Sequence, residues 1–344
     1  MKAMMLTGIR EMEMKEIPDP VLKNPNDVKI KIMVLGICGS DIHYYTLGRI
    51  GSQVVKYPFT VGHESAGEVI EIGPAVTRVR KGDIIAIEPA IWCGICDQCL
   101  SGRHHTCRKL KFLGCPGQAE GALSEYIVMP EASCYPLPGT LTPDHGAISE
   151  PLAIGVYAVK KAGGIKGARV GILGFGPIGM SVMLAAKAQE AGEIYVTDKI
   201  DQRLSLSVRE KAVWTGNPLK DNIMESINQK VPFGLDVVFE CCGQQEAVDQ
   251  AIDILKPGGS LIIVGIPEFK RWTLSVDDTR RREIAIQFIR RQVDCVEAAL
   301  EMMNNGKIDV GNMVTHRFPF KNTKEAFDLV AGYHDGVMKA MIDF

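Results

Sequence analysis

The sequence predicts an α/β protein of two domains, one built on a doubly wound parallel sheet and the other rich in β-structure. Three observations lead to this prediction. The chain has 344 residues, and one domain usually contains about 100–200. In the middle of the chain, short apolar runs alternate with helical patterns, which is typical of parallel sheets. The N-terminal segment instead alternates apolar and polar residues between glycines, as half-buried strands do.

The composition is that of an ordinary globular protein. Hydrophobic residues make up 46% and charged residues 23% of the sequence, and the formal net charge is −2. A nearly neutral chain without a basic stripe argues against nucleic acid as a partner. No apolar stretch reaches the ~20 residues that span a bilayer, and the first residues lack the pattern of a signal peptide. We therefore expect no membrane partner and a cytoplasmic location.

The order of the expected elements supports the division into domains. In the first 150 residues, strands are expected at 28–34, 69–72 and 84–87. Beyond residue 151, strands are expected at 170–173, 193–197, 235–239 and 260–264, with helices at 180–188 and 246–255. Helices at 293–303 and 326–332 and a strand at 337–344 follow, and this last strand could return to the first domain. The basic run at residues 280–282 is interpreted as a solvated turn.

The segment Gly174-Phe-Gly-Pro-Ile-Gly179 is a GxGxxG motif between an expected strand and an expected helix. In that context the first glycine permits a tight turn, the second lets the backbone approach a pyrophosphate, and the third lets helix and strand pack closely. The helix N-terminus adds N–H donors for the phosphates. The residues predicted to bind a dinucleotide here are Gly174, Gly176, Pro177, Ile178 and Gly179.

Asp198, at the end of the next expected strand, bears on the choice between the two nicotinamide dinucleotides. A carboxylate there accepts hydrogen bonds from the adenosine ribose hydroxyls and repels a 2′-phosphate. The sequence therefore favours NAD over NADP. Arg203 lies close by in the sequence and is a second candidate contact. Because an arginine can hold a phosphate, it leaves NADP open.

Four of the ten cysteines follow the spacing Cys93-x2-Cys96-x2-Cys99-x7-Cys107. In a reducing compartment such a cluster indicates a metal rather than disulfides. Four thiolates can surround one zinc ion in a closed site that leaves no position for substrate. We expect a structural zinc in a lobe at residues 90–110, with free or redox-active thiols as the alternative. The remaining cysteines outside the metal sites are expected to pack as small apolar residues: Cys115, Cys134, Cys241, Cys242 and Cys295.

A second metal site is predicted from Cys38 together with His63 and Glu64. A cysteine, a histidine and a carboxylate can hold zinc and leave one position open, as a catalytic zinc requires. A Gly-His-Glu triplet alone is weak evidence, but the dinucleotide motif and the cysteine cluster in the same chain strengthen it. Glu150 stands where the two domains are expected to meet, and its carboxylate could bind the zinc or its water.

Taken together, these segments resemble the zinc-dependent medium-chain alcohol dehydrogenases, and within them the sorbitol, L-iditol and xylitol dehydrogenases. The resemblance covers nearly the whole chain. Its carriers are the four cysteines and residues 36–44, 48–51, 62–64, 150–152, 174–179 and 264–267. It implies a GroES-like β-barrel catalytic domain formed by residues 1–150 and 290–344. It also implies a Rossmann domain formed by residues 151–289, which binds NAD.

The activity that the resemblance implies is oxidation of a secondary alcohol of a polyol to a ketose, with hydride transfer to NAD. The catalytic zinc would be held by Cys38, His63 and Glu64. Glu150 would bind the zinc in some states or hydrogen-bond its water. Ser40 and His43 are candidates to pass the released proton to solvent, since histidine titrates near neutral pH. Either residue could instead only pack or cap the helix.

The resemblance also assigns the residues around the substrate. Tyr44 and Arg290 match positions that contact polyol hydroxyls. Arg291 stands where this branch usually has an aromatic residue, which puts the polyol-contacting end of the pocket in doubt. The residues expected to line the nicotinamide are Val264, Gly265 and Ile266.

Two rival interpretations stay open at this point. A related zinc dehydrogenase acting on threonine or another secondary alcohol would use the same metal and cofactor residues and differ only in its substrate pocket. A redox sensor or structural protein on the same fold would be expected to have lost metal ligands, whereas Cys38, His63 and Glu64 are all present. Homotetramers are common among the relatives, so a homotetramer acting on a small-molecule polyol is expected.

Overall fold

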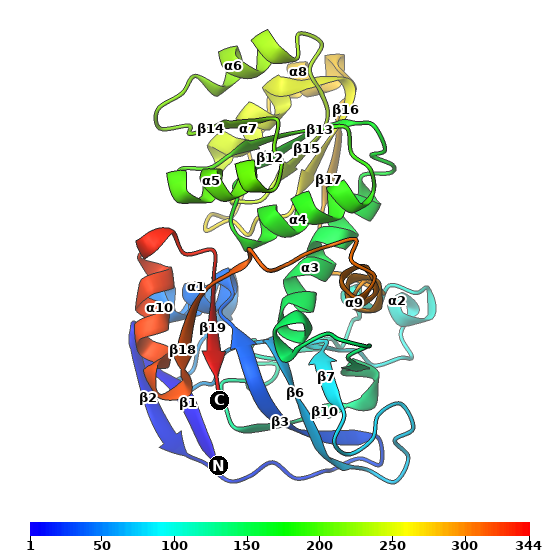
Figure 1. Ribbon diagram of the computed structural model, residues 1–344, viewed down its shortest axis with the longest axis vertical. Coiled ribbons are helices and arrows are strands. Elements are labelled where there is room, and N and C mark those ends of the chain that lie inside the picture. Colours follow the sequence, from blue (N-terminus) through cyan, green and yellow to red (C-terminus); the bar gives the residue numbers. More distant parts are fainter. The chain divides into compact units, whose positions relative to one another are not determined.

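The computed structural model describes residues 1–344, which form two compact units (Figure 1). Unit 1 comprises Met1–Glu150 and Val296–Phe344, and unit 2 comprises Pro151–Cys295. The chain passes from the first unit to the second within helix α3 (Pro143–Lys161). Residues 290–295, which the sequence analysis placed with the catalytic domain, belong to unit 2 by this division.

Unit 1 is built mainly from β-structure. The strands of its main sheet are β3 (Asp27–Gly36), β6 (Glu64–Ile72), β7 (Ile84–Ile87), β10 (Tyr126–Pro130), β11 (Cys134–Pro136), β18 (Val314–Pro319) and β19 (Lys339–Asp343). They are ordered β11-β7-β6-β3-β19-β18, and β10 also pairs with β3. Because β19 runs antiparallel beside β3, the C-terminal segment completes a sheet that the N-terminal segment begins.

Smaller elements surround this sheet. Three two-stranded sheets pair β1 (Lys2–Gly8) with β2 (Glu11–Glu16), β4 (Arg49–Ile50) with β5 (Gln53–Val54), and β8 (Ala90–Ile91) with β9 (Lys111–Phe112). The helices are α1 (Gly39–Leu47), α2 (Asp97–Leu100), α9 (Val296–Asn304) and α10 (Thr323–Ala331), with 3-10 turns at His104–Thr106, Glu131–Ser133, Phe320–Asn322 and His334–Gly336.

Strand β3 shows why the sequence forms this sheet. Val28, Ile30 and Ile32 are buried in the core of unit 1, whereas Lys31 and Met33 between and after them are exposed. Successive side chains of a strand point to opposite faces, so this alternation places one apolar face inward. Burying each large aliphatic side chain stabilises the fold by roughly 1.5–3 kcal/mol.

Unit 2 contains the parallel sheet that the sequence predicts. Its strands are β12 (Arg169–Leu173), β13 (Glu193–Thr197), β14 (Trp214–Gly216), β15 (Leu235–Glu240), β16 (Leu255–Ile263) and β17 (Ala285–Phe288). The strand order is β14-β13-β12-β15-β16-β17, and every pairing is parallel. The direction of winding reverses between β12 and β15, which is the doubly wound arrangement and confirms the predicted fold class. Ligands of such sheets bind beyond the carboxyl ends of the strands at this reversal.

Helices cover both faces of the parallel sheet (Figure 1). They are α4 (Pro177–Ala188), α5 (Asp201–Arg209), α6 (Ile223–Lys230), α7 (Gln245–Ile254) and α8 (Val276–Arg281). Right-handed crossovers put α4 and α5 on one face, and α6 and α7 on the other, because the chain winds outward from β12 in opposite directions.

Two predictions for unit 2 need correction. The strand expected at 260–264 begins already at Leu255, because the segment pairs with β15 through an irregular register. The basic run at 280–282 is solvated at Arg280 and Arg281, as expected, but it forms the end and C-cap of α8 rather than a turn. The guanidinium of Arg282 donates to the carbonyl oxygens of Ile252 and Leu255, which satisfies orphan carbonyls at the C-terminus of α7.

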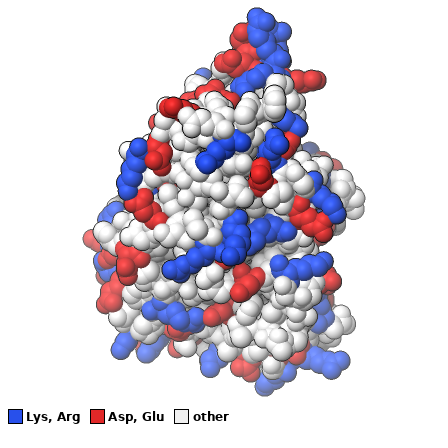
Figure 2. Space-filling model, turned by 45° about the horizontal axis from the view of Figure 1, so that its top comes forward, with Lys and Arg blue, Asp and Glu red and all other residues white.

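No helix of the structure has both the length and the apolar character needed to cross a lipid bilayer. Acidic and basic side chains are interspersed over the face drawn in Figure 2. This pattern agrees with the small net charge of the sequence.

Candidate functional site

Cys38, His63 and Glu64 come together in unit 1. One donor atom from each lies within 4.8 Å of the other two. Cys38 is the N-cap residue of α1, and His63 and Glu64 stand where β6 begins. His63 and Glu64 are buried, while Cys38 is partly exposed. A thiol, an imidazole and a carboxyl group gathered in this way can hold zinc and leave a position open.

Asp41, which the sequence analysis missed, ties the two segments of this cluster together. Its side chain is 0% exposed and accepts hydrogen bonds from the backbone N–H groups of Cys38 (3.2 Å) and Gly62 (3.1 Å). Its Oδ1 lies 3.4 Å from Nδ1 of His63. Metal-binding histidines usually direct their second ring nitrogen at such a carboxylate, which leaves the other nitrogen for the metal.

The electrostatics of the cluster favour a cation. Burial lowers the pKa of His63, but the negative charges of Asp41 and Cys38 outweigh burial and raise this pKa well above its usual range. The site therefore attracts positive charge to the imidazole, whether a proton or a metal ion supplies it.

Lys339, also missed by the sequence analysis, pairs with Glu64 behind the cluster. Its Nζ lies 2.5 Å from Oε2 of Glu64 and donates to the carbonyl oxygen of Ile37 at 3.1 Å. Both charged side chains are only 1% exposed. Burial lowers the pKa of Lys339, but the charges of Glu64 and Cys38 outweigh it and raise the pKa. The lysine is therefore a buried cation.

The sheet order explains how residues 275 positions apart meet. Strand β3 lies between β6 and β19, and Gly36 of β3 is paired with Glu64 on one side and with Met341 on the other. A Cβ atom on Gly36 would lie 2.5 Å from Oε2 of Glu64 and 3.3 Å from Cδ of Lys339. The missing side chain at Gly36 thus provides the space in which the ion pair forms.

The charges of this donor set match a divalent ion. With Cys38 as a thiolate, the anions are Cys38, Glu64 and Asp41, and the only cation among the named groups is Lys339. The formal charges of these four groups sum to about −2 at neutral pH when His63 is neutral, as a metal ligand must be. A zinc ion would neutralise this buried charge.

The other predicted catalytic residues lie around the same cluster. Ser40 Oγ donates to Sγ of Cys38 at 3.3 Å, so it contacts a candidate ligand directly. His43 lies three residues further along α1 and is partly exposed, on the same face of the helix as Ser40. Glu150 is buried at the end of the first segment of unit 1. Its charge contributes to the raised pKa of Lys339, although it is not one of the three converging donors.

Tyr44, the predicted substrate contact in unit 1, is buried with its hydroxyl engaged. The hydroxyl donates to Oε1 of Gln53 at 3.2 Å and lies 3.7 Å from Sγ of Cys115. Gln53 is not among the residues predicted from the sequence. The expectation that Cys115 only packs is incomplete, since its thiol belongs to this polar group.

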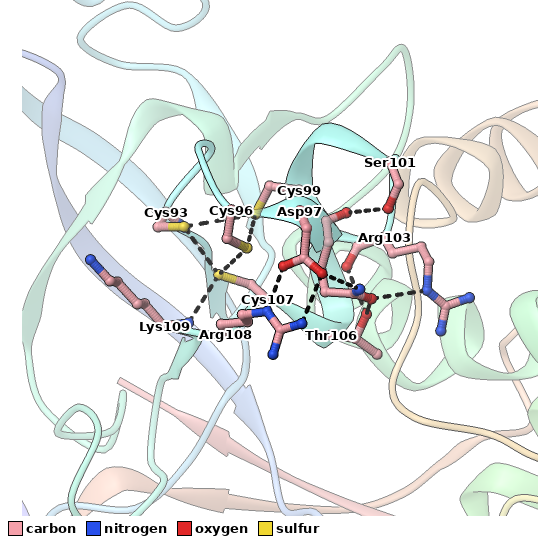
Figure 3. A network of polar contacts seen from close by, with 11 residues as sticks. Cys93, Cys96, Asp97, Cys99, Ser101, Arg103, Thr106, Cys107, Arg108 and Lys109 are labelled. Carbon is pink, nitrogen blue, oxygen red and sulfur yellow. Dashed lines mark hydrogen bonds and ion pairs between the residues drawn. The ribbon is translucent and has the colours of Figure 1, made fainter.

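The four cysteines of the lobe also converge (Figure 3). Their sulfur atoms are 3.5–4.0 Å apart for the four pairs Cys93–Cys107, Cys96–Cys99, Cys96–Cys107 and Cys93–Cys99. Zinc–sulfur bonds of about 2.3 Å in a tetrahedron place the sulfurs about 3.8 Å apart. The pocket between the thiols therefore has the size of one zinc ion.

Backbone groups of the lobe stabilise thiolates. The N–H groups of Cys93 and Lys109 donate to Sγ of Cys107 at 3.3 and 3.4 Å. Backbone N–H groups of Arg108 and Cys99 lower the pKa of the Cys96 thiol to about 6. The thiolate is the form that binds zinc, so these main-chain contacts prepare Cys96 and Cys107 for a metal, whereas burial raises the pKa of the Cys99 thiol to about 12.

The glycine-rich turn of unit 2 has the geometry that the motif requires. Gly174 has a φ of +94°, which only glycine adopts readily. A Cβ on Gly179 would lie 2.0 Å from the carbonyl oxygen of Gly174, so a residue with a side chain does not fit where the helix packs against the turn. Gly176 caps α4, Pro177 occupies its first turn and Ile178 follows. These residues leave the helix N-terminus open to a phosphate.

Asp198 and Arg203 both lie against this turn. Asp198 is buried, and its carboxylate accepts hydrogen bonds from the N–H groups of Phe175 (2.6 Å) and Ile200 (2.8 Å). A Cβ on Gly176 would lie 3.3 Å from a guanidinium nitrogen of Arg203. A negative and a positive group thus both face the glycine-rich turn, one suited to ribose hydroxyls and the other to a phosphate.

The residues expected to meet the nicotinamide follow β16. Val264 and Gly265 donate their N–H groups to the carbonyl oxygen of Glu240 at 2.8 and 3.0 Å, and Ile266 is exposed. Arg290, the predicted substrate contact in unit 2, follows β17 and is exposed. The expectation that Cys242 packs as a small apolar residue is wrong: Cys242 is exposed, because it stands in the turn after β15.

Comparison with known proteins agrees with this geometry. The model of the alcohol dehydrogenase GroES-like domain matches residues 24–139, and that of the zinc-binding dehydrogenase domain matches residues 177–305. Sorbitol dehydrogenase from Bacillus subtilis is 34% identical over 343 residues, which are 99% of this chain and 97% of that protein. The chain belongs to the zinc-binding medium-chain alcohol dehydrogenases, of the sorbitol dehydrogenase type.

Further relatives extend the comparison. L-idonate 5-dehydrogenase from Vitis vinifera is 35% identical over 95% of this chain and 90% of its own length. The crystal structure of a zinc-binding dehydrogenase from Sinorhizobium meliloti bound to NADP has a TM-score of 0.90 and 30% identity, and covers 100% of this chain and 99% of that one. These findings confirm the GroES-like and Rossmann domains, the oxidoreductase class and the cofactors zinc and NAD(P). They also remove the interpretation as a non-enzymatic protein.

Proposed function

We propose that this protein oxidises a secondary alcohol of a polyol, of the sorbitol, xylitol or L-iditol type, to a ketose, with NAD as hydride acceptor. The observation that carries the proposal is the convergence of Cys38, His63 and Glu64 within 4.8 Å. The polyol as substrate class is supported by the names of the relatives, above all the sorbitol dehydrogenase of Bacillus subtilis.

In this proposal the catalytic zinc is held by Cys38, His63 and Glu64, and Glu150 binds it directly or hydrogen-bonds its water. When bound, the zinc supplies Lewis acidity that lowers the pKa of the alcohol, and the dinucleotide supplies the hydride acceptor. The chain's own residues prepare this site. Asp41 orients His63 and closes the gap between the two ligand segments, so that the ligands are in place before substrate arrives.

Ser40 and His43 would move the released proton to solvent. Ser40 contacts Cys38, His43 lies on the same face of α1 and is partly exposed, and imidazole exchanges protons near neutral pH. Tyr44 and Arg290 would contact the substrate hydroxyls. The buried hydroxyl of Tyr44 is already oriented by Gln53 and Cys115, which suits a directional contact.

The dinucleotide would lie on the turn of residues 174–179, with Asp198 at the adenosine ribose and residues 264–266 at the nicotinamide. Buried Asp198 supports NAD, whereas Arg203 and the NADP-bound relative support NADP. The variant Asp198→Ala decides between them. We expect a higher KM for NAD and weaker discrimination against NADP, measured as the ratio of kcat/KM for the two cofactors; an unchanged ratio would contradict the role of Asp198.

The four-cysteine lobe would hold a structural zinc. Its donors form a closed set with sulfur spacing suited to tetrahedral zinc, and the binding energy of such an ion adds to folding.

We also propose a homotetramer in the cytoplasm. Strand β17 ends the parallel sheet of unit 2, and Ala285, Gln287 and Phe288 on it are exposed. An edge strand of this kind is normally covered by another chain or element. All ten cysteines are free thiols, which suits a reducing compartment. Light scattering coupled to size-exclusion chromatography measures the number of subunits.

The experiment that tests the function compares initial rates of NAD and NADP reduction on sorbitol, xylitol, L-iditol, threonine and ethanol, with and without a zinc chelator. Fast, chelator-sensitive oxidation of the polyols alone is the expected result. Preference for threonine or another secondary alcohol would favour the alternative of a related zinc dehydrogenase. Activity that survives complete removal of zinc would contradict the metal site.

A further inference from the structure

Glu240 is a fully buried acid at the carboxyl end of β15. Its side chain is 0% exposed, and the other buried positions of β15 and β16 are mostly leucine, valine, isoleucine and phenylalanine. Burial raises the pKa of this carboxyl group. An acid in such a position destabilises the fold unless its oxygens are hydrogen-bonded. The groups that its oxygens bind therefore indicate what it does.

Glu240 holds two loops at once. Its Oε1 accepts hydrogen bonds from the N–H groups of Cys242 (2.7 Å) and Gly243 (2.5 Å) in the loop after β15. Its main-chain carbonyl accepts from Val264 (2.8 Å) and Gly265 (3.0 Å) in the segment after β16. Four backbone donors from two neighbouring loops thus end on one residue.

Close backbone contacts tie the positions of these loops to one another. A Cβ on Gly265 would lie 2.2 Å from the backbone nitrogen of Gly243 and 2.6 Å from Oε2 of Glu240. A Cβ on Gly174 would lie 2.7 Å from Cβ of Cys242. The loops after β12, β15 and β16 are therefore packed against each other without room for another side chain, and a shift of the middle loop must displace its neighbours.

One oxygen of Glu240 has no such partner. Its Oε2 is buried without a hydrogen bond and faces the backbone of Gly265. A buried carboxylate oxygen that is left unsatisfied is rare and needs an explanation. An apolar residue of similar size would avoid this unsatisfied oxygen, but it would also lose the two hydrogen bonds that Oε1 accepts.

We propose that Glu240 is a positioning residue for the nicotinamide end of the dinucleotide. The inference rests on the proposed function, in which residues 264–266 line the nicotinamide and residues 174–179 bind the pyrophosphate. The strands β12 and β15 flank the point where the winding reverses, which is where ligands of such sheets bind. Glu240 fixes the position of residues 264–265 relative to the turn of residues 174–179. The adenosine end depends instead on Asp198, which follows β13 on the other side of β12.

The test compares NAD with ADP-ribose, which lacks only the nicotinamide, by calorimetric titration of the full-length enzyme and its variants. Glu240→Leu removes both side-chain hydrogen bonds, so we expect NAD affinity to fall about tenfold or more, while ADP-ribose affinity changes less than about twofold. Glu240→Gln keeps an accepting oxygen and should retain most of the NAD affinity. If Glu240→Leu does not fold, Glu240→Asp, which withdraws the carboxylate by one methylene, should show the same selective loss for NAD.

The outcomes separate this inference from the function on which it rests. Selective loss of NAD affinity, rescued in Glu240→Gln, supports the positioning role. Equal weakening of NAD and ADP-ribose, or no weakening of either, would overturn it while leaving the proposed function intact. Failure of the native enzyme to bind either ligand would overturn the proposed dinucleotide site and this inference with it.

Discussion

The four-cysteine lobe and the Cys38 cluster both gather metal donors, but they collect them over very different distances along the chain. The lobe takes four like ligands from positions no more than 14 apart and supports them with backbone N–H groups. The Cys38 cluster takes three unlike ligands from two segments and supports them with buried charged side chains, Asp41 and Lys339.

Under the proposed function, this difference gives one domain both a closed and a reactive metal site. Four thiolates complete a tetrahedron, so nothing further can bind. Three unlike donors leave one coordination position open. The buried charged side chains of Asp41 and Lys339 keep these donors in place without occupying that position. The comparison predicts that changes in the Cys38 cluster affect turnover, whereas changes in the lobe affect stability.

The largest effect is expected for Glu64→Gln. The change removes a negative donor from the open site, so kcat/KM should fall by more than about 100-fold, because even partners of metal ligands contribute 10–100-fold. Circular dichroism should show that the fold is kept. Glu71→Gln, on an exposed position of the same strand, is the matched control and should be nearly native. Near-normal turnover of Glu64→Gln would mean that the ligand set is wrong.

The next largest effect is expected for Lys339→Met. Without the lysine, the carboxylate of Glu64 is buried and unpaired, and breaking a buried pair on one side destabilises a protein by about 3–5 kcal/mol. In the zinc-loaded enzyme the loss should be smaller, since the ion then compensates Glu64.

The measurement is the free energy of unfolding of wild type and variant, each with and without zinc. Lys31→Met, at an exposed position of β3, controls for loss of a lysine. The same destabilisation in both metal states would show that the ion pair acts independently of the metal site.

A smaller effect on chemistry and a clear effect on stability are expected for Cys99→Ser. Serine is a poor zinc ligand, so the lobe should lose its ion and with it the binding energy that supports folding. The melting temperature should fall by several degrees, while turnover per folded molecule should stay close to native. Atomic absorption should show about one zinc fewer per chain. A large loss of turnover with an unchanged melting temperature would move this zinc into catalysis.

What the sequence could predict follows the same division. The cysteine lobe and the glycine-rich turn are local patterns, and the residues that they predict do converge in the structure. The three donors of the open site were predicted by their chemical types and by the resemblance. Asp41 lies beside Cys38 in the sequence and could have been suspected, because histidine ligands usually have a carboxylate partner. The start of β16 was missed because strand pairing, not local propensity, sets it.

Lys339 could not have been found from local pattern. It stands in the last strand of the chain, 275 positions from its partner, and meets Glu64 only because β3 separates the two strands with a glycine at the crossing point. The sequence predicted that a C-terminal strand could return to the first domain. Strand order and register, which decide what a buried side chain meets, arise from tertiary packing.

The smallest effect is expected for Arg108→Ala in the lobe. Arg108 makes two hydrogen bonds with Asp97, at 2.5 and 2.9 Å (Figure 3), which looks like a strong support for the zinc lobe. Both side chains are more than half exposed, however, and exposed ion pairs contribute little because water and salt screen them. We expect a melting temperature within about 2 °C of the native value and unchanged zinc content. A loss of zinc in this variant would show that the lobe, like the open site, depends on a charged side chain. The two centres would then differ only in whether that charged side chain is buried or exposed.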